Sequence, residues 1–295
     1  MKIEIDLGAG PCFGVKRATE IAEKILLEEG KVLCMGDLIH NEQEINRLER
    51  LGMKTIKLSD IPSVTGNKVL FRAHGEPPQS YVVVKKNKKE IIDASCPIVL
   101  NLQKLIASVY EKTKNTATQI VIYGDKNHAE VRSLQGNCKH QAIIISHFDD
   151  LKKIDFYKSI HLFSQTTKYR SDYHLIRRKI EEILKEQEIN LNTHLFFHDS
   201  SCKIVAERDQ QLKEFISTQD VLVFVSGSKS SNGRQLFQIC SNSSTPSYFV
   251  TKPDEIEKYW FKDKENIGIS GATSTPYWLL EKSKQTISQL LSLGQ

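Results

Sequence analysis

Short apolar runs alternate with longer segments of helical period along the whole chain. The longer segments have apolar residues three and four positions apart, as amphipathic helices do, and cover residues 15–29, 98–113, 173–187, 203–218 and 277–293. The short runs are candidate strands, at residues 2–6, 31–35, 68–73, 91–94, 119–123, 141–146, 159–164, 193–198, 220–226, 246–250 and 267–270. This alternation predicts α/β layering with mostly parallel strands.

Three cysteines occupy equivalent places in this alternation. Cys12, Cys96 and Cys202 each follow a candidate strand and precede a candidate helix. They are separated by 84 and 106 residues, which suits one α/β unit each. The spacing therefore predicts three similar α/β domains, at residues 1–95, 96–201 and 202–295, with the first strand and Cys12 in the first of them.

Polar side chains gather just after the candidate strands. In open parallel sheets, ligands bind outside the carboxyl ends of strands, where helix N-termini supply unpaired N–H groups and a positive field. The side chains at these positions are His40, Asn41, His74, His128, Glu130, Gln165, Thr166, Thr167, Ser230, Ser231, Asn232 and Ser274. Imidazoles, hydroxyls and amides together supply the directional donors that a diphosphate needs, so they predict one anion pocket.

Glu130 is the one carboxylate among these donors. A site that only bound phosphate would exclude it by repulsion. Its presence indicates proton transfer close to a reacting atom, with a pKa tuned by partial burial. A helix cap or a surface glutamate at the start of a helix is the alternative interpretation.

The six cysteines contain no CxxC pair, so a zinc knuckle or a thioredoxin motif is excluded. Three thiolates brought together at helix N-termini could hold a catalytic zinc, or an iron–sulfur cube with one open iron. Three unrelated buried cysteines are the alternative. Cys34 lies inside a strand pattern and Cys138 and Cys240 lie at apparent helix ends, where packing or exposure explains them.

Composition narrows the class of protein further. The net charge of +5, from 41 Lys and Arg against 36 Asp and Glu, mildly favours an anionic ligand but is too small to indicate a nucleic-acid-binding protein. No apolar run approaches the ~18 residues that span a bilayer, and the N-terminus lacks the pattern of a signal peptide. We therefore expect a cytoplasmic protein with neither a membrane nor a nucleic acid as partner.

Eight short motifs occur in a characteristic order over nearly the whole chain: GPCFGVKRA, IHN, AHG, DASCP, HAEV, SQTT, SSN and STP. In this order they resemble the 4-hydroxy-3-methylbut-2-enyl diphosphate reductases, the last enzymes of the methylerythritol phosphate route to isoprenoids. The resemblance implies three α/β domains in a pseudo-threefold arrangement around a 4Fe-4S cluster. Its three protein ligands would be Cys12, Cys96 and Cys202.

The same resemblance assigns roles to the polar side chains. Thr166 would hydrogen-bond the substrate's terminal hydroxyl oxygen as it binds the open iron, and Glu130 would deliver the proton. Two electrons passing through the cluster would remove the hydroxyl and leave an allyl species, which is protonated to isopentenyl or dimethylallyl diphosphate. A ferredoxin or flavodoxin is the expected electron donor. The diphosphate would be held by His40, His74, His128, Ser230, Ser231, Asn232 and Ser274.

The chain departs from the usual pattern of that family at a few positions. Asp209 replaces a glutamine after Arg208, Ala129 replaces a proline, Pro11 replaces an aromatic residue, and Lys229 replaces an asparagine. Two other functions stay open on the residues alone. One is a three-domain iron–sulfur Lewis-acid enzyme of the quinolinate synthase kind, and the other is a binding protein for a phosphorylated metabolite.

Overall fold

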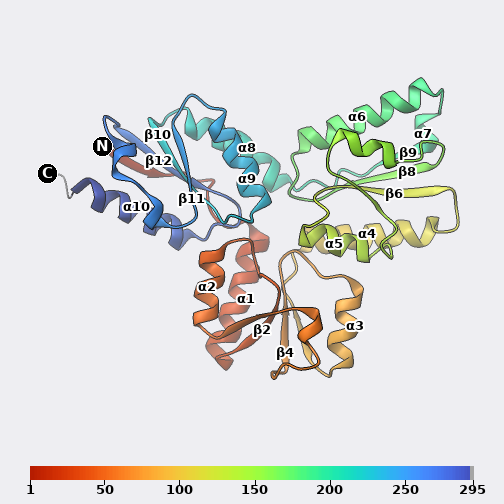
Figure 1. The fold of residues 1–295 in the computed structure, drawn as a ribbon, viewed down its shortest axis with the longest axis horizontal. Helices are drawn as coiled ribbons and strands as arrows, with labels where there is room; N and C mark the ends of the chain where they lie inside the picture. The colour runs from red at the N-terminus through yellow and green to blue at the C-terminus, as the bar shows by residue number, and fades with distance from the viewer. Residues whose placement is uncertain (293–295) are drawn as a thin grey trace. The chain divides into compact units, whose positions relative to one another are not determined.

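The computed structural model describes residues 1–292, which form three four-stranded sheets connected by helices (Figure 1). The strand orders are β1-β12-β10-β11, β3-β2-β4-β5 and β7-β6-β8-β9. The strand pairs within them run parallel. The predicted α/β class with parallel sheets is confirmed. No helix in the described residues is long and apolar enough to cross a membrane.

The first sheet has β10 and β12 at its centre, and helices cover both of its faces. Along β10, Val221, Val223 and Val225 pack on the side of α10, while Leu222 and Phe224 pack against α8 and α9. Alternate side chains of a strand point to opposite faces, so a strand buried on both sides is apolar throughout. The elements are β1 (Lys2–Ile5), β10 (Val221–Val225), β11 (Ser247–Val250), β12 (Asn266–Gly271), α8 (Lys203–Ile216), α9 (Ser231–Ser241) and α10 (Tyr277–Ser292).

The N-terminal strand joins this sheet rather than the sheet of the other early strands. Lys2 pairs with Asn266 and Ile5 with Ile269, in parallel. The first strand thus pairs with a strand of the C-terminal part of the chain rather than with the other strands of residues 1–95. Ile3 and Ile5 pack against the core on the α10 side of the sheet, whose other residues come mostly from the C-terminal part of the chain.

The second sheet contains a strand that the sequence pattern does not predict. β3 (Met53–Ile56) has the sequence MKTI, with apolar residues only at its ends, and it was not among the predicted strands. Met53 and Ile56 are both buried and, being three residues apart, they point to opposite faces of this edge strand. The elements around it are α1 (Phe13–Glu29), β2 (Val32–Met35), α2 (Glu42–Arg50), β4 (Lys68–Phe71), α3 (Pro78–Lys86) and β5 (Glu90–Asp93).

The third sheet is also covered on both faces. On β6, Val121 and Tyr123 pack on the side of α6, whereas Ile120 and Ile122 pack against α4 and α5. The elements are α4 (Pro97–Thr113), β6 (Thr118–Tyr123), α5 (Ala129–Gly136), β7 (Ile143–Ile145), β8 (Ser159–Ser164), α6 (Arg170–Glu186), α7 (Leu191–His194) and β9 (Leu195–Phe197). Short 3₁₀ helices lie at Leu58–Asp60, Phe148–Lys153, Pro253–Glu255 and Lys258–Phe261.

Two predicted elements do not have the predicted ends. Residues 193–198 were predicted as one strand, but α7 extends to His194 and only Leu195–Phe197 is strand. Asn190 caps α7 by accepting the N–H of Asn192 at 3.0 Å, which favours the helical turn locally. The predicted C-terminal helix corresponds to α10, and its last predicted residue, 293, lies outside the described residues.

By contact density the chain divides into two compact units. Unit 1 contains residues 1–32 and 37–55 and the chain from Lys203 onward, and unit 2 contains residues 33–36 and 56–202. The division into three domains at residues 1–95, 96–201 and 202–295 stays a prediction. Each unit carries part of the predicted site.

Candidate active site

The three cysteines of the predicted ligand set stand directly at helix starts. Cys12 is the N-cap residue of α1 and Cys96 is that of α4, both with extended backbone, and Cys202 immediately precedes α8. All three are partly exposed. A helix N-terminus presents unpaired N–H groups and a positive field, which stabilise a thiolate.

The other three cysteines are chemically different. Cys34, Cys138 and Cys240 are buried, and each directs its thiol at a backbone carbonyl. The sulfur–oxygen distances are 3.2 Å to Gly36, 3.3 Å to Gln135 and 3.3 Å to Leu236, respectively. Burial raises the pKa of Cys138 and raises that of Cys240 to about 12, which keeps both as neutral thiols. These three cysteines serve as packing residues, as their positions predicted.

In unit 2, Glu130 lies in the first turn of α5 and is 1% exposed. One of its carboxylate oxygens accepts the N–H of Thr166 at 2.7 Å, and the other accepts the Thr166 hydroxyl at 2.8 Å. Burial raises the pKa of Glu130 to about 7, even though both hydrogen bonds act to lower it. Glu130 is therefore a carboxyl group that exchanges a proton near neutral pH, as general acid catalysis requires.

His128 is the N-cap residue of α5, and its Nδ1 accepts the N–H of Glu130 at 3.2 Å. A backbone N–H can only donate, so the proton of the neutral ring is on Nε2, which becomes a donor. The ring of His74 lies edge-on to that of His128, with centroids 5.5 Å apart. Unit 2 thus brings two of the predicted anion-binding imidazoles together beside Glu130.

Two of the predicted metal ligands belong to the same group of side chains. The N–H of Cys202 donates to the carbonyl of Thr166 at 3.0 Å. Burial raises the pKa of the Cys96 thiol, and the charges of Cys202 and Glu130 raise it further. These charges act on Cys96 because all three groups share one small region. A thiol in such a place becomes a thiolate ligand only when a metal centre supplies the compensating positive charge.

In unit 1, His40, Ser230 and Ser274 form a second group. The Ser274 hydroxyl oxygen lies 3.1 Å from that of Ser230 and 3.2 Å from the carbonyl oxygen of His40. Ser230 is the N-cap residue of α9 and accepts the N–H of Gly233 at 3.0 Å. Ser231 is the first residue of that helix, so this group surrounds a helix N-terminus, which favours anions.

Close backbone packing holds this second group together. A Cβ on Gly227 would lie 2.4 Å from the carbonyl oxygen of His40 and 2.8 Å from Cα of Asn41, so only glycine fits there. Glu42, at the start of α2, accepts the N–H of Ser228 at 3.2 Å and also its hydroxyl. Partial burial acts to raise the pKa of Glu42, but the hydrogen bonds that it accepts from Ser228 and from the backbone of Glu42 and Lys229 together lower the pKa. The loop after β10 is thereby fastened to the His40 segment.

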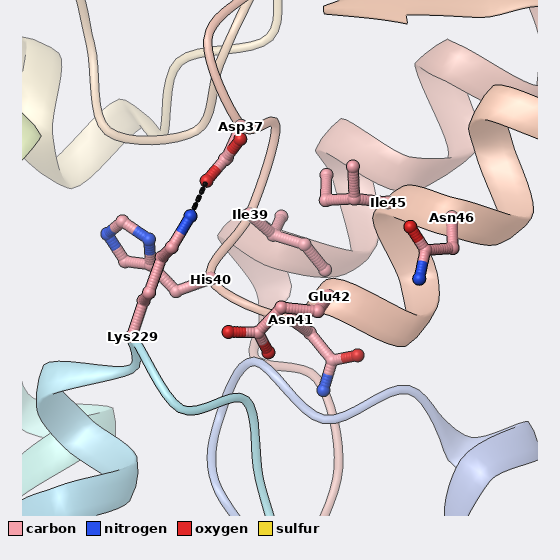
Figure 2. Close-up of a pocket in the computed structure, with 8 residues that line it drawn as sticks. All are labelled: Asp37, Ile39, His40, Asn41, Glu42, Ile45, Asn46 and Lys229. Atoms are coloured by element: carbon pink, nitrogen blue, oxygen red, sulfur yellow. Dashed lines mark hydrogen bonds and ion pairs between the residues drawn. The ribbon is translucent and has the colours of Figure 1, made fainter. Parts of the chain in front are cut away.

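A cavity of about 170 Å³ opens beside this loop contact (Figure 2). Lys229 extends past the imidazole of His40, and its ammonium lies 3.2 Å from the carboxylate of Asp37. Both side chains are substantially exposed, so this ion pair contributes little to stability. The residues that line the cavity are Asp37, Ile39, His40, Asn41, Glu42, Ile45, Asn46 and Lys229.

Sequence reasoning missed several residues that hold the site. Arg208, on α8, forms a buried ion pair with Asp6, at the end of β1, and Ser270 of β12 bonds both of them. Arg208 lies six residues after Cys202, and Asp6 lies six residues before Cys12. Thr273 contacts both Cys12 and Asn232. A single sequence gives no signal for the pairing of Arg208 with Asp6 or for Thr273, since these contacts are long-range.

Each unit therefore gathers a set of the predicted site residues. Unit 1 holds Cys12, His40, Ser230, Ser231, Asn232 and Ser274 around the N-termini of α1 and α9. Unit 2 holds His74, Cys96, His128, Glu130, Thr166 and Cys202 around the start of α5. Fold and side chains together define a parallel α/β protein with cysteines, hydrogen-bond donors and a buried carboxyl group of raised pKa near its strand ends.

The comparison with known families agrees with this class. The family model described as LytB protein matches residues 3–288, and the chain belongs to that family. It is 43% identical over 291 residues to the 4-hydroxy-3-methylbut-2-enyl diphosphate reductase of Bacteroides thetaiotaomicron, covering 99% of each chain.

Two solved structures of similar fold are also described as diphosphate reductases. The structure of the E-1-hydroxy-2-methyl-but-2-enyl-4-diphosphate reductase from Plasmodium falciparum superposes with a TM-score of 0.82 at 25% identity, over 96% of this chain and 86% of that one. A second, described as (E)-4-hydroxy-3-methyl-but-2-enyl diphosphate reductase, the terminal enzyme of the non-mevalonate pathway, gives a TM-score of 0.71 at 28% identity, over 97% and 99%.

Proposed function

We propose that this chain reduces 4-hydroxy-3-methylbut-2-enyl diphosphate to isopentenyl and dimethylallyl diphosphate, the final step of non-mevalonate isoprenoid precursor synthesis. Membership of the LytB family and the names of the similar proteins support this reaction. The observation in this chain that carries the proposal is Glu130. It is a buried carboxyl group with a pKa of about 7, held by Thr166 next to Cys96 and Cys202.

The cysteines of the site suit an iron–sulfur cofactor. Three of the six stand partly exposed at helix starts, whereas the other three are buried and turned toward carbonyls. Cys12, Cys96 and Cys202 would hold a 4Fe-4S cluster through their thiolates, with one iron left for substrate. When bound, the cluster would pass on, one at a time, the two reducing electrons of the reaction. The pseudo-threefold arrangement of three domains around it belongs to this proposal.

The donors of both units would hold the substrate's diphosphate. His128 presents an Nε2–H in its neutral form, and α9 contributes the positive field of its N-terminus. Hydroxyl and amide donors add directional bonds without the strong charge that would slow release of a diphosphate product. The proposed set is His40, His74, His128, Ser230, Ser231, Asn232 and Ser274.

Glu130 and Thr166 would handle the protons. The net reaction takes up two electrons and two protons, and the substrate's terminal hydroxyl leaves as water. Thr166 is bonded through both its N–H and its hydroxyl to Glu130, so a hydroxyl group of substrate at Thr166 also lies within reach of that carboxyl. With a pKa of about 7, Glu130 is protonated in about half of the molecules at neutral pH and can pass its proton on. Its burial excludes bulk water from this transfer.

The electrons must come from another protein. We propose a small one-electron carrier, a ferredoxin or a flavodoxin, as the partner. This part of the proposal rests on the family resemblance, and the reduction itself can be tested with a chemical reductant in place of the partner.

The test is anaerobic purification followed by iron and sulfide analysis and a reductive assay with the hydroxymethylbutenyl diphosphate. We expect a brown protein that contains iron and sulfide and that forms both product diphosphates only when reductant is present. A colourless protein that still binds the diphosphate would support the metabolite-binding alternative. Turnover that needs no reductant would support a Lewis-acid enzyme instead.

A further inference from the structure

The amide of Asn232 has a defined orientation. Asn232 lies in the first turn of α9 and is 4% exposed. Its Oδ1 accepts the backbone N–H of Thr273 at 3.0 Å and the hydroxyl of Thr273 at 2.9 Å. Because a backbone N–H can only donate, the end of the amide facing Thr273 must be the oxygen. The Nδ2 group therefore faces away from Thr273.

This orientation matters for an anionic ligand. The amide nitrogen carries two N–H donors and accepts nothing, whereas the oxygen only accepts. An asparagine that presents nitrogen attracts a phosphate oxygen, and the flipped amide would repel it. In the flipped state the Nδ2 donors would face the backbone N–H of Thr273, so that hydrogen bond would be lost in a buried place, which is costly.

Thr273 has a second contact in the same site. Its carbonyl oxygen accepts the N–H of Cys12, the N-cap residue of α1, at 3.0 Å. Thr273 is 8% exposed and follows β12 in the loop that carries Ser274. One buried residue thus joins a predicted cluster ligand to a predicted diphosphate ligand, and both contacts lie within unit 1.

We propose that Thr273 is a positioning residue for diphosphate binding. It holds Asn232 with its two N–H donors directed at the diphosphate, while its carbonyl holds the backbone at Cys12. The inference rests on the proposed function, because it needs a diphosphate beside Asn232.

Three variants separate this role from a merely structural one. Thr273→Val keeps the size of the side chain and the hydrogen bond from the backbone N–H but removes the hydroxyl. Asn232 then keeps one of the two hydrogen bonds that orient its amide. Thr273→Ser keeps the hydroxyl. Thr275→Val is the matched control, because the hydroxyl of Thr275 is also buried but donates to the carbonyl of Val225 at 2.7 Å.

The measurements use the anaerobically purified holoprotein. Calorimetry gives its affinity for inorganic diphosphate, and the reductive assay gives KM and kcat. We expect Thr273→Val to weaken diphosphate binding and raise KM by about tenfold, the upper range for one hydrogen bond, with kcat and iron content nearly unchanged. Thr273→Ser should restore both values. Thr275→Val should lower the melting temperature without weakening diphosphate binding.

The outcomes distinguish the positioning role of Thr273 from the proposed function on which it depends. Equal diphosphate affinities for Thr273→Val and Thr275→Val, in a wild-type protein that binds diphosphate, would overturn the positioning role alone. A fall in kcat with no change in KM or diphosphate affinity would overturn it as well. A wild-type holoprotein that does not bind inorganic diphosphate at all would overturn the proposed function and this inference with it.

Discussion

The carboxylate of Glu130 accepts two hydrogen bonds from a single residue, Thr166, which donates its N–H to one oxygen at 2.7 Å and its hydroxyl to the other at 2.8 Å. Two such bonds would ordinarily lower the pKa of a carboxyl group. Burial outweighs them and raises the pKa of Glu130 to about 7. The pair therefore fixes the position of the carboxyl group while leaving its proton exchangeable.

Replacing Glu130 by glutamine should abolish proton delivery and preserve the fold. Glutamine keeps the oxygen that accepts the N–H of Thr166, so cluster content and diphosphate affinity should stay close to wild type. We expect kcat to fall by about 10³-fold, within the usual range for loss of a general acid. The control is Glu76→Gln, another buried carboxyl group with a raised pKa, held by Ser80 and Arg72. Equal turnover in the two variants would remove Glu130 from the acid role.

The pH dependence of kcat should follow the protonated fraction of Glu130. An acid with a pKa of about 7 is mostly protonated below that pH, and its protonated fraction falls about tenfold for each pH unit above it. We therefore expect kcat to decline above about pH 7 in wild-type protein. The residual turnover of Glu130→Gln should lack this decline. Steady-state assays with saturating substrate measure it, and a parallel decline in both proteins would assign the titration to another group.

The two sets of cysteines should respond differently to serine. Cys96→Ser should lose most of its iron and sulfide, because a serine oxygen is a poor substitute for a thiolate ligand. Cys138→Ser is the control, since its hydroxyl can donate to the carbonyl of Gln135 as the thiol does. It should keep iron and sulfide at the wild-type level. Iron analysis of the anaerobically purified proteins measures this difference. Unchanged iron in Cys96→Ser would contradict the ligand assignment.

The buried ion pair of Arg208 and Asp6 should contribute to the stability of unit 1. Arg208→Met leaves the Asp6 carboxylate buried without its partner, at a cost of ~3–5 kcal/mol in the free energy of unfolding. The double variant Asp6→Asn with Arg208→Met should recover part of this loss. Urea titration of each protein measures it. Lys179→Met, which removes an exposed ion pair with Glu182, is the control and should leave the midpoint of urea unfolding unchanged. An equally small effect of Arg208→Met would refute the prediction.

Gly227→Ala tests the close packing of the loop after β10 against the His40 segment. The added Cβ would meet the carbonyl oxygen of His40 at 2.4 Å, so the loop after β10 must move away from the His40 segment. We expect KM for the diphosphate substrate to rise more than tenfold, with a smaller change in kcat. Gly30→Ala serves as the control, because it costs stability through its positive φ of 69° but has no neighbour within 4 Å of the new Cβ. A similar KM in both variants would show that the loop contact is not needed for binding.

Local pattern determined most of the secondary structure and the candidate residues. The apolar run of β10 and the strand-to-helix positions of Cys12 and Cys96 follow from periodicity and order along the chain, which is local information. The LytB family membership, which is carried by short motifs, was predicted from the same information and is confirmed.

Only the tertiary structure decided which distant segments meet. The pairing of Lys2 with Asn266 joins segments far apart along the chain, and an isolated strand sequence does not name its partner. The same holds for Thr273, which becomes important only because folding places it between Cys12 and Asn232. The pKa of Glu130 also depends on burial, and burial is a property of the assembled core rather than of the residue order.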